Sequence, residues 1–99
     1  ALIIASDPVA HLPAAASEWL RQIPVIAIDP NPNLTTSTAR VVLPTACCGI
    51  DAGGTYYRMD GVPIRLRPVL AAARPTDEQV LRQLLALLAP TSPTAVPAC

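Results

Sequence analysis

The sequence predicts an α/β fold in which a partial lobe with a parallel sheet is followed by a β-hairpin and a carboxyl-terminal helix. Two short apolar runs, residues 1–8 and 25–30, both end in Asp-Pro. Continuous apolar runs bounded by turn residues are typical of parallel strands buried on both faces. An Asp-Gly pair between two β-rich runs indicates the hairpin, and an amphipathic run after residue 76 indicates the helix.

A helix is expected between the first two strands. Pro13 can open it, residues 14–22 are good helix formers, and Trp19, Leu20 and Ile23 form an apolar cluster. A further helix and strand follow the second strand: a short helix is expected at residues 35–40, and a strand at residues 41–43 that ends at Pro44. The first half of the chain is therefore expected to form three parallel strands with helical connections.

Residues 55–67 are expected to form the hairpin, with strands at 55–59 and 62–66 and a two-residue turn at Asp60-Gly61. Arg58, Arg65 and Arg67 line it, and the last two share a face because side chains alternate along a strand. One interpretation is that these charges protect a solvated edge strand. The other is that they contact a partner carboxylate or a dinucleotide.

The last expected helix covers residues 76–89, with Thr76 as its N-cap and two acidic residues in its first turn. Its apolar side chains are Val80, Leu81, Leu84, Leu85, Leu87 and Leu88. Residues 1–89 are thus interpreted as one lobe. Residues 90–99 form a Pro-rich tail without a core-forming pattern.

The composition predicts that the chain buries surface against other subunits. Of its 99 residues, 52% are hydrophobic and only 14% are charged. A domain of this length buries only about 60–68% of its unfolded surface, so it cannot hide so much apolar area alone. A net charge of zero argues against a nucleic-acid partner, and no apolar run is long enough to span a membrane.

The cysteines do not predict a disulfide framework. Cys47 and Cys48 are adjacent, and Cys99 ends the chain. An odd number of cysteines without a secretory leader favours reduced thiols and a cytoplasmic protein. Since His11 is the only histidine and there is no Cys-x-x-Cys, a metal site is less expected than small thiols buried under the sheet.

Candidate ligand-binding residues follow the predicted strands. Asp7 and Asp29 lie at the carboxyl ends of two strands, where open parallel sheets bind ligands. Their carboxylates could accept hydrogen bonds from ribose hydroxyls or a guanine edge, or could instead form Asx-turns or helix caps. The hydroxyls at residues 35–38 could bind a phosphate or cap their helix. No Gly-rich phosphate loop is present, which excludes a typical NAD or ATP site here.

Two segments carry a resemblance to the molybdopterin oxidoreductase superfamily: Thr-Thr-Ser-Thr-Ala-Arg-Val-Val-Leu-Pro at residues 35–44, and Asp-Ala-Gly-Gly-Thr at residues 51–55. Within that superfamily, residues 57–67 and the two Asp-Pro segments resemble the B-type subunit of formylmethanofuran dehydrogenase, over about residues 1–89. The chain departs from the pattern at Arg40, where an aspartate is usual, and at Cys47-Cys48.

The resemblance implies a Rossmann-like nucleotide-binding lobe from the carboxyl-terminal part of that subunit. Family members hold tungsten or molybdenum through a cysteine or selenocysteine, and an iron–sulfur cluster through amino-terminal cysteines. Neither set occurs in this chain. A relative of the B-type subunit that has lost its redox role occurs in the formyltransferase/hydrolase complex of methylotrophic bacteria. The chain is interpreted as most similar to that relative.

The expected function is therefore that of a non-catalytic structural subunit, without cofactor or metal of its own, in a cytoplasmic hetero-oligomeric complex. By resemblance, such a complex moves a formyl group from formyl-tetrahydromethanopterin to a methanofuran-type carrier, and another subunit releases formate. The alternative is a fragment of the tungsto- or molybdopterin-binding subunit of a formylmethanofuran dehydrogenase. In that case the guanine dinucleotide is expected to contact Asp29, Thr35, Thr36 and Arg58. A stand-alone nucleotide-binding module is the weakest interpretation, because its sheet would be incomplete.

Overall fold

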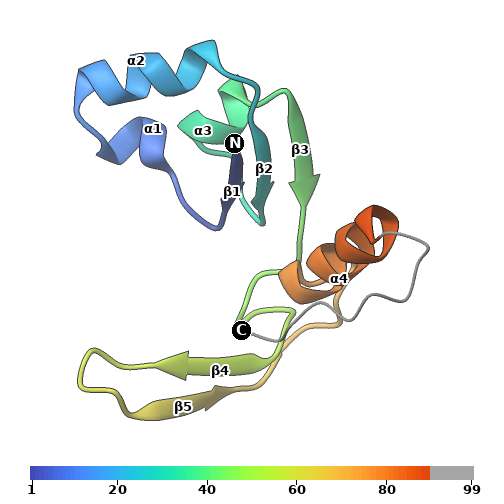
Figure 1. Cartoon of the computed structure of the whole chain (residues 1–99). Coiled ribbons are helices and arrows are strands. Elements are labelled where there is room, and N and C mark those ends of the chain that lie inside the picture. The colour runs from blue at the N-terminus through green and yellow to red at the C-terminus, as the bar shows by residue number, and fades with distance from the viewer. Residues whose placement is uncertain (90–99) are drawn as a thin grey trace.

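A three-stranded parallel sheet forms the first half of the chain in the computed structural model, which describes residues 1–89 (Figure 1). The strands are β1 (Leu2–Ile4), β2 (Ile26–Asp29) and β3 (Val41–Pro44), in the order β1-β2-β3. The carboxyl ends of all three strands point the same way, so the residues that follow them lie at one edge of the sheet. The predicted α/β fold with its parallel sheet is confirmed.

Three helices connect these strands: α1 (Pro8–His11), α2 (Ala14–Gln22) and α3 (Leu34–Thr38). Helix α2 has the predicted bounds, and Pro13 occupies its N-cap position. The single turn α1 has no counterpart in the sequence prediction. The hydroxyl of Ser17 on α2 donates to the carbonyls of Val9 and Leu12, at 3.1 and 3.2 Å, and so fixes the corner between the two helices. Helix α3 starts one residue earlier and ends two residues earlier than predicted.

The core lies around the central strand β2. Ala27 and Ile28 are buried, as is Val9 from α1. At the amino-terminal end of the sheet, however, Leu2 and Val41 flank Ile26 in register and all three are exposed, Leu2 by 50%. The prediction that the strands are buried on both faces is therefore wrong for this row, since no element of residues 1–89 covers it.

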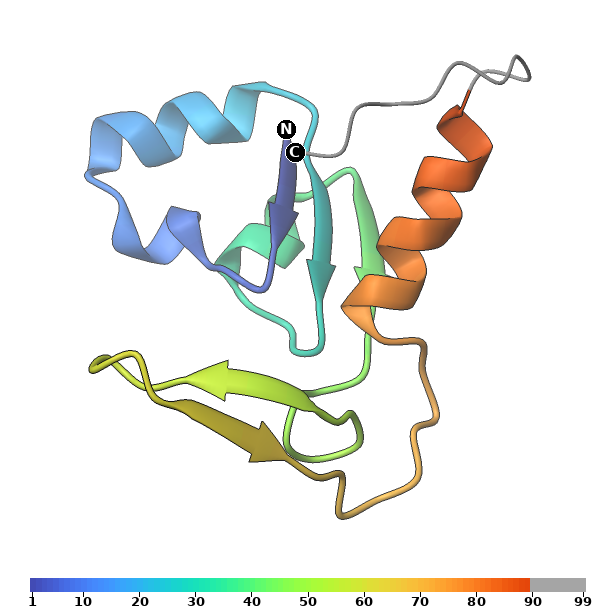
Figure 2. The ribbon, with the colours of Figure 1, turned by 60° about the horizontal axis from the view of Figure 1, so that its bottom comes forward.

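A two-stranded antiparallel hairpin, β4 (Gly54–Tyr57) and β5 (Pro63–Leu66), forms the second sheet. Tyr56 pairs with Ile64 and Thr55 with Arg65. Figures 1 and 2 both place the hairpin beyond the carboxyl ends of the parallel strands, apart from their sheet. The hairpin is thus present as predicted, with strands shorter than expected.

The connection in the hairpin differs from the predicted two-residue turn. The N–H of Gly61 donates to the Arg58 carbonyl at 2.8 Å, and the N–H of Arg58 donates to the Val62 carbonyl at 3.0 Å. The loop therefore contains three residues, 59–61. Gly61 ends it with φ of +80°, the left-handed residue that such loops need in their last position. An Asp-Gly pair suits both loop lengths, so the sequence does not distinguish between them.

Helix α4 (Asp77–Leu88) follows the hairpin and begins near the carboxyl end of β3, where the N–H of Ala46 donates to the carbonyl of Pro75 at 2.9 Å (Figures 1 and 2). Thr76 is its N-cap, as predicted: its hydroxyl accepts from the N–H of Gln79 at 3.2 Å, and the Gln79 side chain accepts from the N–H of Thr76 at 2.9 Å. Val80 is the buried residue of the helix. No helix within residues 1–89 is long and apolar enough to cross a membrane. The predicted tail, with Cys99, lies outside the described residues.

The chain is less compact than a free domain of its length. The radius of gyration is 15.9 Å, whereas a compact domain of 100 residues has about 13 Å. Large apolar side chains remain exposed on every part of the structure, including Trp19 at 67%, Tyr56, Leu85 and Leu87. The composition predicted more apolar surface than the chain can bury by itself, and much of this surface is indeed exposed within residues 1–89.

We expect the 99-residue chain, produced alone, to aggregate or stay unfolded. Each 100 Å² of apolar surface left exposed forgoes about 2.5 kcal/mol of stabilisation. The measurement is size-exclusion chromatography together with thermal unfolding followed by circular dichroism. A soluble monomer with a cooperative transition would show that the exposed apolar side chains need no partner surface.

We expect Gly61→Val to destabilise the hairpin by about 1–2 kcal/mol, because a β-branched residue is strained at positive φ. A Cβ at this position meets no atom within 4 Å, so the backbone alone is the cause. Amide hydrogen exchange of Arg58 in the assembled protein measures the effect. Gly61→Asn is the matched control, because asparagine tolerates left-handed backbone. Equal losses in the two variants would contradict this explanation.

Candidate functional site

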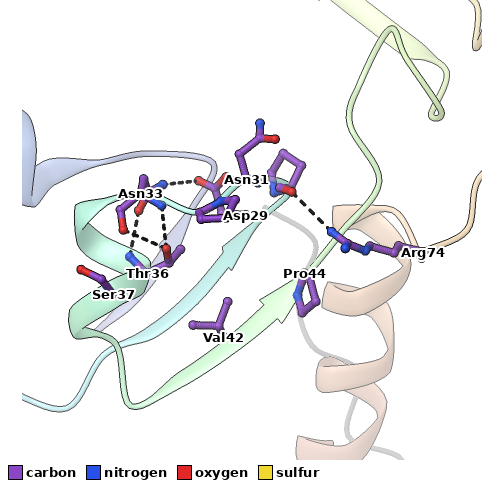
Figure 3. Close-up of a pocket in the computed structure, with 10 residues that line it drawn as sticks. Asp29, Asn31, Asn33, Thr36, Ser37, Val42, Pro44 and Arg74 are labelled. Carbon is purple, nitrogen blue, oxygen red and sulfur yellow. Dashed lines mark hydrogen bonds between the residues drawn. The ribbon is translucent and has the colours of Figure 1, made fainter.

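A cavity of about 320 Å³ opens at the carboxyl ends of β2 and β3, between α3 and the segment that precedes α4 (Figure 3). Its volume lies in the range of small-molecule sites, and its position is the one at which open parallel sheets bind ligands. Val42 and Pro44 contribute apolar surface. The polar side chains that line the cavity are Asp29, Asn31, Asn33, Thr36, Ser37 and Arg74.

Asp29 ends β2 and places its carboxylate at the cavity. One oxygen accepts from the N–H of Asn31 at 2.9 Å, and the other accepts from the side-chain amide of Asn33 at 3.0 Å. The first contact is the Asx-turn that the sequence left as one interpretation. Each carboxylate oxygen has a second acceptor position. The carboxylate is therefore held in place and can still accept a hydrogen bond from a ligand.

The start of α3 is fully capped. Asn33 accepts from the N–H of Thr36 at 2.8 Å, and the hydroxyl of Thr36 accepts from the N–H of Asn33 at 2.8 Å. The N–H groups of Leu34 and Thr35 both donate to the carboxylate of Asp7, at 3.3 and 3.0 Å. Of the two interpretations of residues 35–38, the structure shows the helix cap, since these first N–H groups are not free for a phosphate.

Asp7 links the end of β1 to α3. Its carboxylate accepts from the Thr35 hydroxyl at 2.7 Å, and that hydroxyl accepts from the N–H of Val9 at 3.1 Å. Thr35 is only 1% exposed. The Thr35 hydroxyl is the main reason that the pKa of Asp7 lies below its usual 3.8; desolvation opposes this effect, and the two N–H groups of α3 add to it. The carboxylate of Asp7 thus has a structural role, because it holds the start of α3, and it does not line the cavity.

The structure brings together two of the four residues predicted to contact a dinucleotide. Asp29 and Thr36 both line the cavity. Thr35 is buried on the other side of α3, with its hydroxyl engaged by Asp7. Arg58 lies in the hairpin, where it forms an ion pair with Asp60 and lowers the pKa of that carboxyl. Contact of any of the four with a cofactor stays a prediction.

Arg74 is the lining residue that the sequence analysis missed. It lies just before the cap of α4, and its guanidinium reaches the carbonyl of Pro30 at 3.5 Å (Figure 3). The two residues are 44 positions apart in the chain. The local sequence around Arg74 does not predict a cavity residue, because only the packing of the segment before α4 near the carboxyl end of β3 brings this side chain to the cavity.

The cysteines lie away from this site, in the loop that follows β3. Cys47 is half-buried and Cys48 is exposed, and both are free thiols. The prediction that they are buried under the sheet is wrong, because the chain leaves the sheet at Pro44. The N–H of Cys47 donates to Asp51 at 2.6 Å, which organises the loop. Within residues 1–89, no three histidine, cysteine or acidic side chains gather in a way that could hold a metal ion.

Comparison with known proteins decides the relationship. The chain is 43% identical, over 86 residues, to the subunit lettered B of the tungsten-containing formylmethanofuran dehydrogenase 2 of Methanocaldococcus jannaschii; the match covers 85% of this chain and 20% of that protein. The chain is homologous to part of the B-type subunit of formylmethanofuran dehydrogenase. The same subunit from Methanococcus maripaludis is 39% identical over 84 residues, which cover 83% of this chain and 19% of the relative. No protein-family profile matches the chain.

The chain spans about one fifth of the length of these curated relatives, consistent with the expected carboxyl-terminal part of the B-type subunit. The expected function in a formyltransferase/hydrolase complex is wrong, because both relatives are named as tungsten-containing dehydrogenases, which are oxidoreductases. That expectation relied on the missing metal ligands. A segment that matches one fifth of a relative carries no information about ligands in the other four fifths.

We expect the contribution of Asp7 to stability to disappear in acid. Its pKa is lower in the folded chain than the unfolded value of 3.8, so the charged carboxylate stabilises the fold at pH values above that value. The stabilisation is lost as the pH falls through the lower, folded pKa. Amide exchange of Thr35, in the assembled protein with the wild-type chain and with Asp7→Asn, measures it at several pH values.

The difference between these two proteins should be largest near neutral pH and should shrink toward the most acid samples. Glu18→Gln, an exposed change on α2, is the control and should leave the Thr35 amide unaffected at every pH. A difference between wild type and Asp7→Asn that is the same at all pH values would contradict the role of the ionised carboxylate.

Proposed function

We propose that this chain forms part of the cofactor-binding lobe of a formylmethanofuran dehydrogenase, and that its cavity receives the nucleotide end of a tungsto- or molybdopterin guanine dinucleotide. The homology to one subunit of two tungsten-containing dehydrogenases supports the enzyme class. One observation supports the location of the nucleotide site: the carboxylate of Asp29 is fixed by hydrogen bonds and lines a cavity at the carboxyl ends of parallel strands.

The residues present fit the nucleoside part of such a cofactor. Asp29 keeps acceptor positions for ribose hydroxyls or for the N–H groups of a guanine edge. Val42 and Pro44 offer apolar surface against which a flat base can pack. The hydroxyls of Thr36 and Ser37 donate to backbone carbonyls, at 2.9 and 2.7 Å, and keep a lone pair that can accept from a ligand.

The cofactor, when bound, supplies the metal centre for oxidation or reduction of the formyl group. The residues of this chain bind and orient its nucleotide end. In this proposal Asp29 and Thr36 contact the cofactor directly. Thr35 acts through Asp7, which fixes α3 and with it the position of Thr36. A contact from Arg58 would require the cofactor to extend to the hairpin, and nothing in residues 1–89 supports that contact further.

The proposal includes a hetero-oligomeric setting in the cytoplasm. The relatives are each named as one lettered subunit of an enzyme, which supports further subunits as partners. The exposed apolar residues of the sheet, of α2 and of the hairpin are the surfaces that such partners, or the rest of the same polypeptide, would bury. The free thiols of Cys47 and Cys48 are compatible with a reducing compartment.

We expect Asp29→Asn to lower the cofactor content of the assembled enzyme, because the change removes the charge of a hydrogen-bond acceptor for the nucleotide. Loss of a hydrogen bond to a charged group costs about 1.5–3 kcal/mol, or roughly 10- to 150-fold in affinity. The measurements are guanine nucleotide released by acid, bound tungsten or molybdenum, and formylmethanofuran oxidation, each per assembled complex.

Asp51→Asn is the matched control, since Asp51 also accepts a short bond from a loop N–H but does not line the cavity. This variant should retain nucleotide, metal and activity. Full cofactor content in Asp29→Asn, or equal losses in the two variants, would contradict a nucleotide site at Asp29.

A further inference from the structure

Two charged side chains line the cavity, and they come from different parts of the chain. The carboxylate of Asp29 lies at the end of β2, and the guanidinium of Arg74 reaches across from the segment before α4 (Figure 3). The remaining lining side chains are uncharged. The cavity therefore has one anionic and one cationic group, which is the pattern of charges expected around a ligand that carries both hydrogen-bond donors and a negative group.

The charge of Arg74 is little used within the described part of the chain. Its one hydrogen-bond contact there is the Pro30 carbonyl at 3.5 Å, a long distance for a hydrogen bond. The two ion pairs found in residues 1–89 join Arg58 to Asp60 and Arg82 to Glu78, so neither involves Arg74. A guanidinium has five N–H donors. Most of those of Arg74 are available to a ligand in the cavity.

The backbone at the cavity offers an anion no comparable site. The N–H groups of Leu34 and Thr35 donate to Asp7, and that of Thr36 donates to Asn33. The carboxylate of Asp29 repels negative charge. Among the residues that line the cavity, Arg74 is thus the one group with both a positive charge and free donors.

We propose that Arg74 binds a phosphate of the nucleotide in this cavity, and so makes the site select a nucleotide over the corresponding nucleoside. This inference rests on the proposed function, which it deepens by assigning the phosphate contact. Arginine suits the task, because its planar guanidinium can donate two parallel hydrogen bonds to a phosphate. Asp29 binds the nucleoside part in this arrangement, and Arg74 binds the charged part.

The test compares GMP with guanosine as probes. The full-length protein is produced in a host that cannot make the pterin cofactor, and each probe is titrated by calorimetry. We expect the wild type to bind GMP at least about tenfold more tightly than guanosine, as is typical for a charged hydrogen bond. Arg74→Gln should lose most of that preference while its guanosine affinity is unchanged, and Arg74→Lys should keep part of it.

Arg82→Gln, which removes a cation from α4 outside the cavity, is the control and should behave as the wild type. Unchanged guanosine affinity also shows that Arg74→Gln is folded at the cavity. If GMP and guanosine bind alike, or if Arg74→Gln keeps the preference for GMP, the role of Arg74 is overturned while the nucleotide cavity stands. If neither probe binds the wild type, the proposed function is overturned together with this inference.

Discussion

The hydrogen bonds between Asp7 and α3 are the constraint on which the arrangement of the first half depends. The carboxylate follows β1 directly and takes three donors from Leu34 and Thr35, on a helix that begins 27 residues later. Thr35 is buried, so its hydroxyl needs partners, and it finds them in Asp7 and in the N–H of Val9. This small network joins β1, α1 and α3 at the carboxyl edge of the sheet. It also fixes the side of α3 that faces away from Asp7, on which Thr36 lines the cavity.

The same network decides how the cavity can treat a charged ligand. A short helix whose first N–H groups are all capped cannot bind an anion through its backbone, although its sequence is rich in hydroxyls. The groups at this edge that keep unused hydrogen-bonding positions are therefore side chains, of which Asp29 and Arg74 carry charge. The two side chains are positioned in different ways. Asp29 is fixed by hydrogen bonds within its own loop, whereas the position of Arg74 depends on how the segment before α4 packs near the carboxyl end of β3.

The hairpin and the amino-terminal end of the sheet show a different property of the chain. An isolated two-stranded hairpin is only marginally stable in water, yet β4 and β5 expose nearly all of their side chains. The row of Leu2, Ile26 and Val41 is likewise uncovered. Both surfaces therefore carry apolar side chains that residues 1–89 leave uncovered.

The sequence by itself determined the local structure: the three parallel strands, the bounds of α2, the capped start of α4 at Thr76, and a hairpin that turns at Asp60-Gly61. These features depend on neighbouring residues, through apolar runs, capping hydroxyls and turn chemistry, so the linear pattern contains them. It also placed Asp29 at the edge where the cavity opens, because the ends of parallel strands share one edge. Only the tertiary structure decided that Thr35 faces Asp7, that Arg58 pairs with Asp60 and that Arg74 reaches the cavity. The contacts of Thr35 and Arg74 join residues 28 and 44 positions apart, and the Arg58 pair depends on how a three-residue loop turns the chain. No periodicity or motif in the sequence encodes such contacts, since they arise from the packing of whole elements against one another.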